Sequence, residues 1–600
     1  MFVNQAELKQ KFQELHSSDE KQISAIYSES KRLLIQAPAG YGKTKTMISK
    51  IAYLITTKSP SDNKKILALS FSVNAAYKIK KDLANQLPIL LNNMDFNIND
   101  KLFISNYHGL CRKILKNYGY LFHEKLKDID NIKSIDDGSF ENLMYLEIGL
   151  KDFEAEIMVN INESIRNINN GNYRYLLSNW DKYIDIVTKK FIPNNYLPYN
   201  AILILTVELL EKYTEIKDFY QTYFEIIIVD EFQDTNILSF LLLDNLIGVN
   251  TEVIFIGDSL QRIYGFIGAI PNLIEKCKKK YNMDVIKLDK NYRFKDNPQM
   301  LQLEKNIRAN SEDLSNPKII KDALIPLKIL GNQSEEATWV TGKVTKLLEN
   351  NCSQVAILSR SRGKNIDSII NTLKEKNINY FYGLYTDEDP VYKEFHKRCN
   401  IQFLDMLQYE KNITKAFLQK FFSKINTSYS NSQDIIVESL LKLLEIFTNR
   451  MTTDFVGLQN DDKINLIIDT FSNYALKQNL EYVQENVVIA TIHAAKGLEW
   501  EYVILPDMEQ YVFPSYYGFC GDCNFKLNRV NGFLCNPNFS VFDKNLESKY
   551  LEELSVFYVA VTRAKKQVYF SASEIRLNGS GEEKNAKLSC FLGLEGIKFI

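Results

Sequence analysis

The sequence lacks any apolar run long enough to cross a membrane. Its most apolar stretches, such as 201–210 and 226–229, are far shorter than the roughly 18 residues that a membrane span needs. The first residues show no basic region followed by an apolar run, so we expect no signal peptide. Both absences predict a cytoplasmic protein with no membrane partner.

Cysteine is scarce, and neither sign of charge is in excess. Eight cysteines in 600 residues are too few for a disulfide framework. Lys and Arg total 73 against 74 Asp and Glu, and this balance argues mildly against nucleic-acid binding, because such domains are often basic. A content of 45% apolar and 24% charged residues excludes a mostly disordered chain.

Short apolar runs alternate with helical patterns along the chain. Continuous apolar runs between helices indicate buried parallel strands, so the predicted fold class is α/β. The runs form two groups, which predicts two sheets, and a helical insertion without a strand signal interrupts each half. The predicted strands are 33–36, 66–69, 225–229 and 253–256 in the first half, and 355–358, 487–490 and 502–505 in the second.

The first apolar run leads into a glycine-containing turn and then Gly-Lys-Thr, a pattern typical of a phosphate-binding loop. Gly40 and Gly42 allow the chain to turn and bring backbone N–H groups close to phosphate oxygens. Lys43 supplies a positive charge for the β- and γ-phosphates, and the Thr44 hydroxyl is a candidate Mg²⁺ ligand. The helix that begins near Thr44 adds its N-terminal dipole.

Two carboxylates follow the third predicted strand, 225–229. The carboxyl ends of strands are where ligands of open α/β sheets bind. We expect Asp230 to hold Mg²⁺ and Glu231 to orient and deprotonate the attacking water. Together with the phosphate-binding loop, the pair predicts nucleotide hydrolysis.

The order of motifs along the chain resembles the UvrD/Rep/PcrA-type superfamily 1 DNA helicases over most of both halves. The matching segments, besides the loop and 224–235, are Asp19–Gln22, 69–76, Asn106–His108, 256–269, Leu288–Arg293, 356–361, 491–500 and, after Glu552–Glu553, Tyr558–Ala564. The resemblance implies two RecA-like P-loop NTPase motor domains with parallel sheets, each with a mainly helical insertion. The implied domains are motor domain 1A at 1–112 and 196–300, insertion 1B at 113–195, motor domain 2A at 301–395 and 486–600, and a small insertion 2B at 396–485.

The resemblance implies that ATP and Mg²⁺ bind between the two motor domains. Gln22 would read adenine, Gln261 would sense the γ-phosphate, and Arg563 would act as an arginine finger. The implied catalytic set is Lys43, Asp230, Glu231, Gln261, Arg293 and Arg563. The implied nucleotide contacts are Gln22, Ala39, Gly40, Gly42, Lys43, Thr44, Thr46, Arg293, Arg360, Glu499 and Arg563.

The resemblance also implies DNA contacts, 3′→5′ polarity and partners that are single-stranded and partial-duplex DNA. Phe266 replaces the usual Trp, which should preserve stacking, whereas Ile267 replaces the usual Arg and removes a cation. The implied contacts are Phe71, Asn74, Tyr107, His108, Tyr264, Phe266 and His493. Because the whole chain is nearly neutral, we expect positive potential to concentrate along the cleft lined by Phe71, His108, Tyr264 and His493.

A second hypothesis is a DNA-stimulated ATPase subunit with little unwinding activity of its own. It would serve a larger complex, such as an assembly for anti-phage defence or repair that contains a nuclease. The small second insertion motivates this hypothesis, as does the short stretch after the last motif, which leaves no room for a fused nuclease. RNA as the track is a third alternative.

Three cysteines cluster between the last two motifs. Cys520 and Cys523 have the Cys-x-x-Cys spacing of a zinc knuckle, and Cys535 follows them. With a fourth ligand from elsewhere they would bind Zn²⁺, and His396 with Cys399 is a distant candidate. The alternative is a loop of reduced thiols or a redox-sensitive pair.

Overall fold

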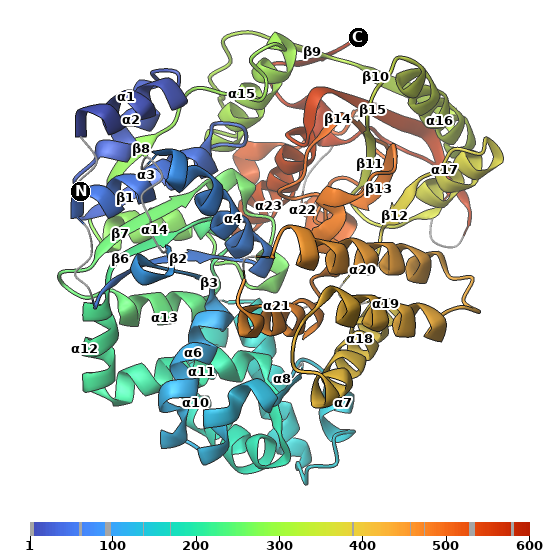
Figure 1. The fold of residues 1–600 in the computed structure, drawn as a ribbon. Helices are drawn as coiled ribbons and strands as arrows, with labels where there is room; N and C mark the ends of the chain where they lie inside the picture. The colour runs from blue at the N-terminus through green and yellow to red at the C-terminus, as the bar shows by residue number, and fades with distance from the viewer. Residues whose placement is uncertain are drawn as a thin grey trace. The chain divides into compact units, whose positions relative to one another are not determined.

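The computed structural model describes residues 5–58, 63–90, 98–135, 137–168, 170–386, 389–456, 458–472, 474–526, 534–577 and 581–600. The chain divides into two compact units, Met1–Lys290 and Asn291–Ile600 (Figure 1). The division precedes residue 300, the predicted end of motor domain 1A. Both units are α/β with a parallel sheet, as the sequence predicts.

The first unit is built on a six-stranded sheet in the order β3-β2-β6-β7-β1-β8. Every neighbouring pair in it is parallel. The strands are β1 (Arg32–Gln36), β2 (Lys65–Ser70), β3 (Leu102–Asn106), β6 (Phe224–Val229), β7 (Glu252–Gly257) and β8 (Asp284–Lys287).

Helices cover both faces of this sheet, which explains the continuous apolar runs. Along β6, Ile226 and Ile228 belong to one core cluster, whereas Ile227 and Val229 belong to another. Successive side chains of a strand point to opposite faces, so a strand covered on both faces is apolar at every position. The helices are α1 (Gln5–Leu15), α2 (Glu20–Tyr27), α3 (Lys43–Lys58), α4 (Val73–Leu90), α5 (Ile98–Lys101), α6 (Tyr107–Tyr118), α11 (Tyr199–Lys212), α12 (Thr214–Tyr223), α13 (Ile237–Leu246) and α14 (Leu273–Lys280).

The insertion of the first unit follows α6 and is mainly helical, drawn in cyan in Figure 1. Its helices are α7 (Phe140–Met144), α8 (Asp152–Arg166), α9 (Asn170–Ser178) and α10 (Trp180–Ile186). It also has a strand pair that the sequence does not predict, β4 (Lys133–Ile135) with β5 (Tyr196–Pro198). Strands of three residues are too short for a periodic signal.

The second unit has a seven-stranded sheet, β10-β15-β14-β11-β13-β12, with β16 paired to β15. Only the β15–β16 pair is antiparallel among these neighbours. The strands are β10 (Leu327–Asn332), β11 (Val355–Ser359), β12 (Phe381–Gly383), β13 (Val487–Thr491), β14 (Trp500–Leu505), β15 (Ala564–Leu577) and β16 (Glu583–Asn585). A separate pair joins β9 (Ala323–Ile325) to β17 (Ile597–Phe599).

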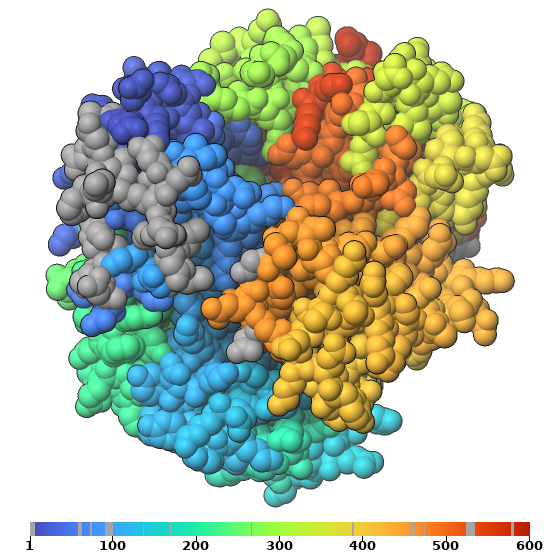
Figure 2. All heavy atoms as spheres, viewed as in Figure 1, coloured from blue at the N-terminus to red at the C-terminus, as the bar shows by residue number. Residues whose placement is uncertain are grey.

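The helices of the second unit include a small inserted group. The inserted helices are α18 (Pro390–Tyr409), α19 (Lys415–Ser428), α20 (Ile435–Thr453) and α21 (Asn460–Ser472), and α18 and α19 form the gold part of the surface in Figure 2. The others are α15 (Pro298–Glu312), α16 (Gln333–Glu349), α17 (Lys364–Glu375), α22 (Gly521–Lys526) and α23 (Lys544–Val561). No helix among the described residues is long and apolar enough to span a membrane.

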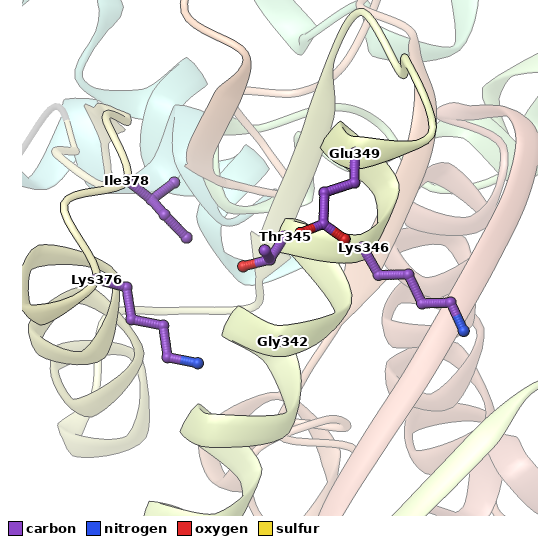
Figure 3. A pocket seen from close by; sticks show the side chains of 6 residues that line it. All are labelled: Gly342, Thr345, Lys346, Glu349, Lys376 and Ile378. Carbon is purple, nitrogen blue, oxygen red and sulfur yellow. The ribbon is translucent and has the colours of Figure 1, made fainter.

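A cavity of about 550 Å³ lies beside the C-terminal half of α16 (Figure 3). Its lining residues are Gly342, Thr345, Lys346, Glu349, Lys376 and Ile378. Because α16 ends and β11 then begins, this cavity lies toward the amino ends of the parallel strands. It is therefore at the edge opposite to the one where α/β sheets bind ligands.

Candidate functional site

The phosphate-binding loop joins the carboxyl end of β1 to the first residue of α3. Gly40 and Gly42 have φ angles of 85° and 79°, a region that side chains disfavour and glycine allows. The Thr46 amide and hydroxyl both donate to the Gly42 carbonyl, at 2.9 and 3.0 Å. The loop therefore leads directly into the N-terminus of α3, where an anion is favoured.

Lys43 contacts the two carboxylates that follow β6. Its Nζ lies 3.5 Å from Asp230 Oδ1 and donates to Glu231 Oε1. Burial alone lowers the pKa of the Lys43 ammonium, but the charges of Asp230 and Glu231 outweigh it and raise the pKa above its ordinary value. Burial raises the pKa of Asp230, and Lys43 opposes that shift. The sequence-predicted lysine and carboxylates thus form one charged group.

Glu231 occupies a backbone position that few residues adopt. Its φ is 52°, and left-handed backbone at a non-glycine residue often marks a functional site. Its amide donates to Asp230 Oδ1 at 2.9 Å, and the Asp230 amide donates to Leu69 O on β2 at 2.9 Å. The end of β6 therefore fixes both carboxylates beside the phosphate-binding loop.

A chain of hydrogen bonds extends from Glu231 to Gln261. Gln233 donates to Glu231 Oε2 and accepts from the Asp258 amide at 3.1 Å. Asp258 Oδ2 in turn accepts from Gln261 Nε2 at 2.9 Å. The motif strings contain Gln233 and Asp258, but spacing alone gives neither residue a role, so this connection was missed from the sequence.

A glycine makes room for this chain. A Cβ on Gly257, the last residue of β7, would lie 2.5 Å from Gln233 Oε1. Only the absence of a side chain there allows the Gln233 amide to reach Asp258.

Gln22 lies beside the phosphate-binding loop but is itself enclosed. Its Nε2 donates to Tyr41 O at 3.0 Å, and its Oε1 contacts His16 Nδ1. The other ring nitrogen of His16 lies 2.8 Å from Ser49 Oγ on α3. Gln22 is only 1% exposed, so in this structure its amide supports the loop carbonyl, and the predicted adenine contact stays a prediction. No sequence signal pointed to His16.

The other predicted nucleotide contacts of the first unit lie along the same segment. Ala39 is buried within the loop, Thr44 is half-buried in the first turn of α3, and Thr46 is buried. The Thr44 hydroxyl and the Asp230 carboxylate are oxygen donors, which suit Mg²⁺.

The predicted DNA contacts of the first unit divide into accessible and buried side chains. The rings of Phe71 and Tyr264 stack with centroids 5.3 Å apart and planes inclined by 15°, and both are half-buried. Tyr107, by contrast, is 3% exposed, and its hydroxyl lies 3.3 Å from Thr235 Oγ1. The position of Tyr107 therefore gives no support to a direct DNA contact, because its ring packs in the core.

His108 stands beside Tyr199, with ring centroids 4.4 Å apart. Burial lowers the pKa of His108 to about 3, so its ring is uncharged at neutral pH. It therefore adds no positive charge to the predicted DNA path. The side chains of Asn74 and Phe266 lie outside the described residues.

In the second unit, Arg293 and Arg563 meet at one residue. Arg293 donates to Thr562 O and to Glu499 Oε1. Arg563 is 3% exposed, and its guanidinium donates to Leu498 O at 3.1 Å and to Thr562 Oγ1 at 3.0 Å. The predicted phosphate-contacting arginines and Glu499 are thus brought together.

Arg360 makes different contacts. It follows β11, and its guanidinium forms two bonds to Glu553, at 2.7 and 3.2 Å. Glu553 also accepts from the amide and hydroxyl of Ser515, at 3.1 and 2.9 Å. Through Glu553, Arg360 is therefore connected to Ser515 in the segment after β14. His493 is half-buried just after the end of β13.

The clustered cysteines are all buried. Among the described residues, the only group of three or more His, Cys, Asp or Glu side chains with ligating atoms within 4.8 Å of one another is Glu336, Asp507 and Glu509. Cys520, Cys523 and Cys535 form no such group, and Cys520 Sγ donates to Pro514 O at 3.2 Å. His396 Nε2 accepts from the Leu476 amide at 3.3 Å. The geometry gives the zinc prediction no support.

Two family models match the chain. The UvrD/REP helicase N-terminal domain matches residues 18–282, and the UvrD-like helicase C-terminal domain matches residues 391–575. The chain belongs to the UvrD/Rep helicase family. This is a family of ATP-dependent DNA helicases, and the two parallel sheets are its two RecA-like motor folds.

Relatives within this family share about a quarter of the sequence. A probable DNA helicase II homolog of Rickettsia conorii is 25% identical, over 94% of this chain and 93% of its own length. A probable DNA helicase II homolog of Mycoplasma capricolum is also 25% identical, over 92% and 84%. The ATP-dependent DNA helicase PcrA of Bacillus subtilis is 23% identical, over 92% and 82%.

Proposed function

We propose that the protein hydrolyses ATP to move along single-stranded DNA in the 3′→5′ direction and to displace the complementary strand of partial duplexes. The observation that carries the proposal is the contact of Lys43 with Asp230 and Glu231 beside the phosphate-binding loop. Family membership supports DNA as the track, and similarity to the ATP-dependent DNA helicase PcrA of Bacillus subtilis supports ATP-dependent unwinding.

Lys43 is the residue whose contacts would change when ATP binds. In the structure its ammonium contacts two carboxylates, whose charges raise its pKa. The triphosphate offers it competing negative oxygens, so Lys43 would exchange Glu231 for the β- and γ-phosphates. Glu231, thereby released, would accept a proton from the attacking water.

Asp230 and Thr44 are the proposed Mg²⁺ ligands. When bound, Mg²⁺ would neutralise negative charge on the phosphates. The chain itself would orient the reacting groups: Gln233 and Asp258 connect Glu231 to Gln261, which we propose faces the γ-phosphate. Arg293 and Arg563 are the proposed cations of the second unit for the charge that develops on the transferred phosphoryl group.

The stacked pair Phe71 and Tyr264 is the proposed grip on DNA in the first unit. Base stacking tolerates any sequence, which suits a protein that moves along the strand. Tyr264 follows Gln261 by three positions, so a shift at the nucleotide is passed over a short distance to a base-stacking ring.

A strand-displacement assay tests the proposal. Duplexes carry a labelled strand and a single-stranded tail at the 3′ end, at the 5′ end or at neither end. We expect ATP-dependent displacement with the 3′ tail alone. Displacement restricted to the 5′-tailed duplex would contradict the proposed polarity.

A second candidate function has one specific observation in its favour, the small group of four inserted helices, α18 to α21. It is a DNA-stimulated ATPase that serves a larger assembly, for example with a nuclease for repair or genome defence. DNA-dependent ATP hydrolysis without displacement of any of the three duplexes would favour this second candidate.

A further inference from the structure

A buried carboxylate joins two helices of the second unit. Glu304 on α15 is 0% exposed, and its Oε1 accepts from the Tyr558 hydroxyl on α23 at 2.8 Å. Arg308, four positions after Glu304 on the same helix, donates to that oxygen at 3.3 Å and to the Tyr558 hydroxyl at 2.6 Å. Its guanidinium also lies 5.0 Å from the centre of the Tyr558 ring. Glu304, Arg308 and Tyr558 thus form a closed group, called here the α15–α23 triad.

The α15–α23 triad fixes how the two helices, which pack against each other, are aligned. Taking a carboxylate out of water costs free energy, and an apolar contact would join two helices at a lower cost. What the charged contact adds is direction, because its hydrogen bonds form only within a narrow range of distances and angles. The triad is therefore better suited to positioning the helices than to holding them together.

Each of these helices adjoins one of the proposed phosphate-contacting arginines. Arg293 lies five positions before α15 begins, and Arg563 lies two positions after α23 ends. The side-chain amide of Asn297, at the start of α15, donates to Lys566 O, three positions after Arg563. A change in the alignment of the helices would therefore displace one arginine relative to the other.

Hydrogen bonds connect the triad to both arginines through Thr562. The Thr562 amide and hydroxyl donate to Tyr558 O, at 3.0 and 2.8 Å. The Thr562 hydroxyl also accepts from the Arg563 guanidinium at 3.0 Å, and the Thr562 carbonyl accepts from Arg293. The position of Tyr558 thus bears on both guanidinium groups over a single helical turn.

We propose that Glu304, Arg308 and Tyr558 are positioning residues that hold Arg293 and Arg563 in the arrangement needed for ATP hydrolysis. The triad acts through the two helices and not by contact with the nucleotide. Misplacement of a catalytic group by about 1 Å can lower a rate about 100-fold, so a small shift of the helices is enough to affect turnover. This inference rests on the proposed function, in which both arginines meet the transferred phosphoryl group.

Steady-state ATP hydrolysis by the full-length chain, with oligo(dT) in excess, tests the triad. Tyr558→Phe removes the hydroxyl and keeps the ring, so we expect kcat to fall about tenfold while KM for ATP changes less than about twofold. Tyr550→Phe is the matched control, because Tyr550 is a fully buried tyrosine of the same helix whose hydroxyl has no hydrogen-bond partner among the described residues. Its kcat should equal that of the parent.

Binding of a transition-state analogue separates positioning from cohesion of the fold. ADP with aluminium fluoride imitates the transferred phosphoryl group, so it should bind Tyr558→Phe about tenfold more weakly than the parent. A non-hydrolysable ATP analogue should bind both proteins equally, because the arginines act mainly on the transition state. A lowered midpoint of thermal unfolding with unchanged kcat and unchanged analogue affinities would overturn the inference, since it shows a structural role alone.

The double variant Tyr558→Phe with Glu304→Gln tests whether the residues act as one group. Its kcat should be no lower than that of the more impaired single variant, because both substitutions disturb the same contact. Falls in kcat that multiply in the double variant would contradict the triad.

Arg563→Ala distinguishes failure of the triad from failure of the proposed function. If Arg563→Ala lowers kcat at least about 100-fold and the triad variants leave it unchanged, the triad is wrong and the proposed role of Arg563 still stands. If Arg563→Ala hydrolyses ATP as the parent does, or if the parent hydrolyses none, the inference and the proposed mechanism are overturned together.

Discussion

The two units place their clustered carboxylates in different surroundings. In the first, Asp230 and Glu231 contact Lys43, which we propose moves to phosphate when ATP binds. In the second, Glu336, Asp507 and Glu509 lie within 4.8 Å of one another and are all buried. We propose that the first arrangement exchanges its charge partner when ATP binds, whereas in the second, burial raises the pKa values of Asp507 and Glu509.

The buried group of the second unit is organised around Glu336. Its two oxygens accept from the hydroxyls of Ser571 and Ser573, both at 2.6 Å. Asn365 donates to Glu336 and to Asp507, both at 2.9 Å. Buried polar groups of this kind are tolerated because they are hydrogen-bonded, and burial with the charge of Glu336 raises the pKa values of Asp507 and Glu509.

The largest expected effect comes from removing the exchangeable charges of the first unit. Lys43→Ala or Glu231→Gln should abolish ATP hydrolysis, a loss of at least about 100-fold in kcat, since each removes a group that acts on the phosphates or the water. A coupled phosphate-release assay measures it. Glu231→Gln should still bind ATP, because the phosphate cradle is intact.

Glu225→Gln is the matched control for this prediction. Glu225 lies at the other end of β6, where it pairs with Lys64 at 2.7 Å. Its loss should leave turnover unchanged. Normal ATP hydrolysis by Glu231→Gln would contradict the assignment of the catalytic base.

The buried acids of the second unit predict a dependence of stability on pH. Burial, and then the negative charge of Glu336, raise the pKa of Asp507 to about 7, against about 3.9 in an unfolded chain. The folded state therefore keeps a proton that the unfolded state loses above about pH 4. The stability that this proton contributes is fully present below about pH 4 and is lost as the pH rises through about 7, by up to about 1.4 kcal/mol per pH unit.

Thermal unfolding between pH 5 and 8 measures this effect. In Asp507→Asn, the decline in the unfolding midpoint of the second unit should be shallower than in the parent. Asp405→Asn, at an exposed position on α18, should decline as the parent does. Identical slopes for all three proteins would show that Asp507 does not set the pH dependence.

Comparison of the two sheets also shows which strands could be predicted from the sequence. The predicted strands are central or well covered, because two buried faces produce a continuous apolar run. The strands β3, β8, β10 and β12, which the sequence does not predict, are the edge strands of the two sheets. Edge strands are short or partly exposed. β15 was missed for a different reason. Its buried Ser571 and Ser573 interrupt the apolar run, and they are tolerated there because their hydroxyls donate to Glu336.

The candidate site was predictable where the motifs themselves supply the residues that contact one another. Lys43, Asp230 and Glu231 come together as the motifs imply. Tyr107, by contrast, is buried. Its burial could not be predicted, because a motif gives the residue type and not the direction in which the side chain points. His16 could not be predicted, since its role depends on packing between α1, α2 and α3.

A smaller effect is expected from breaking the hydrogen-bond chain behind Glu231. Gly257→Ala would place a Cβ 2.5 Å from Gln233 Oε1, and the flexible glutamine end would move away from Asp258. We expect kcat for ATP hydrolysis to fall about tenfold, because the base loses its orientation, while ATP affinity and the unfolding midpoint change little. Gly342→Ala is the control, since a Cβ there meets nothing within 4 Å. Unchanged kcat would show that the chain does not orient Glu231.

The smallest expected effect is at His16, which acts on the nucleotide only through another residue. Its ring fixes the Gln22 amide that supports Tyr41 O in the phosphate-binding loop. Loss of one such hydrogen bond is worth about 1 kcal/mol, so His16→Ala should raise KM for ATP about fivefold with kcat nearly unchanged. Ser49→Ala should give a weaker shift in the same direction, because it removes only the second partner of the ring. Steady-state ATP hydrolysis measures both, and a fall in kcat without a change in KM would show that His16 acts on the chemical step and not on the loop.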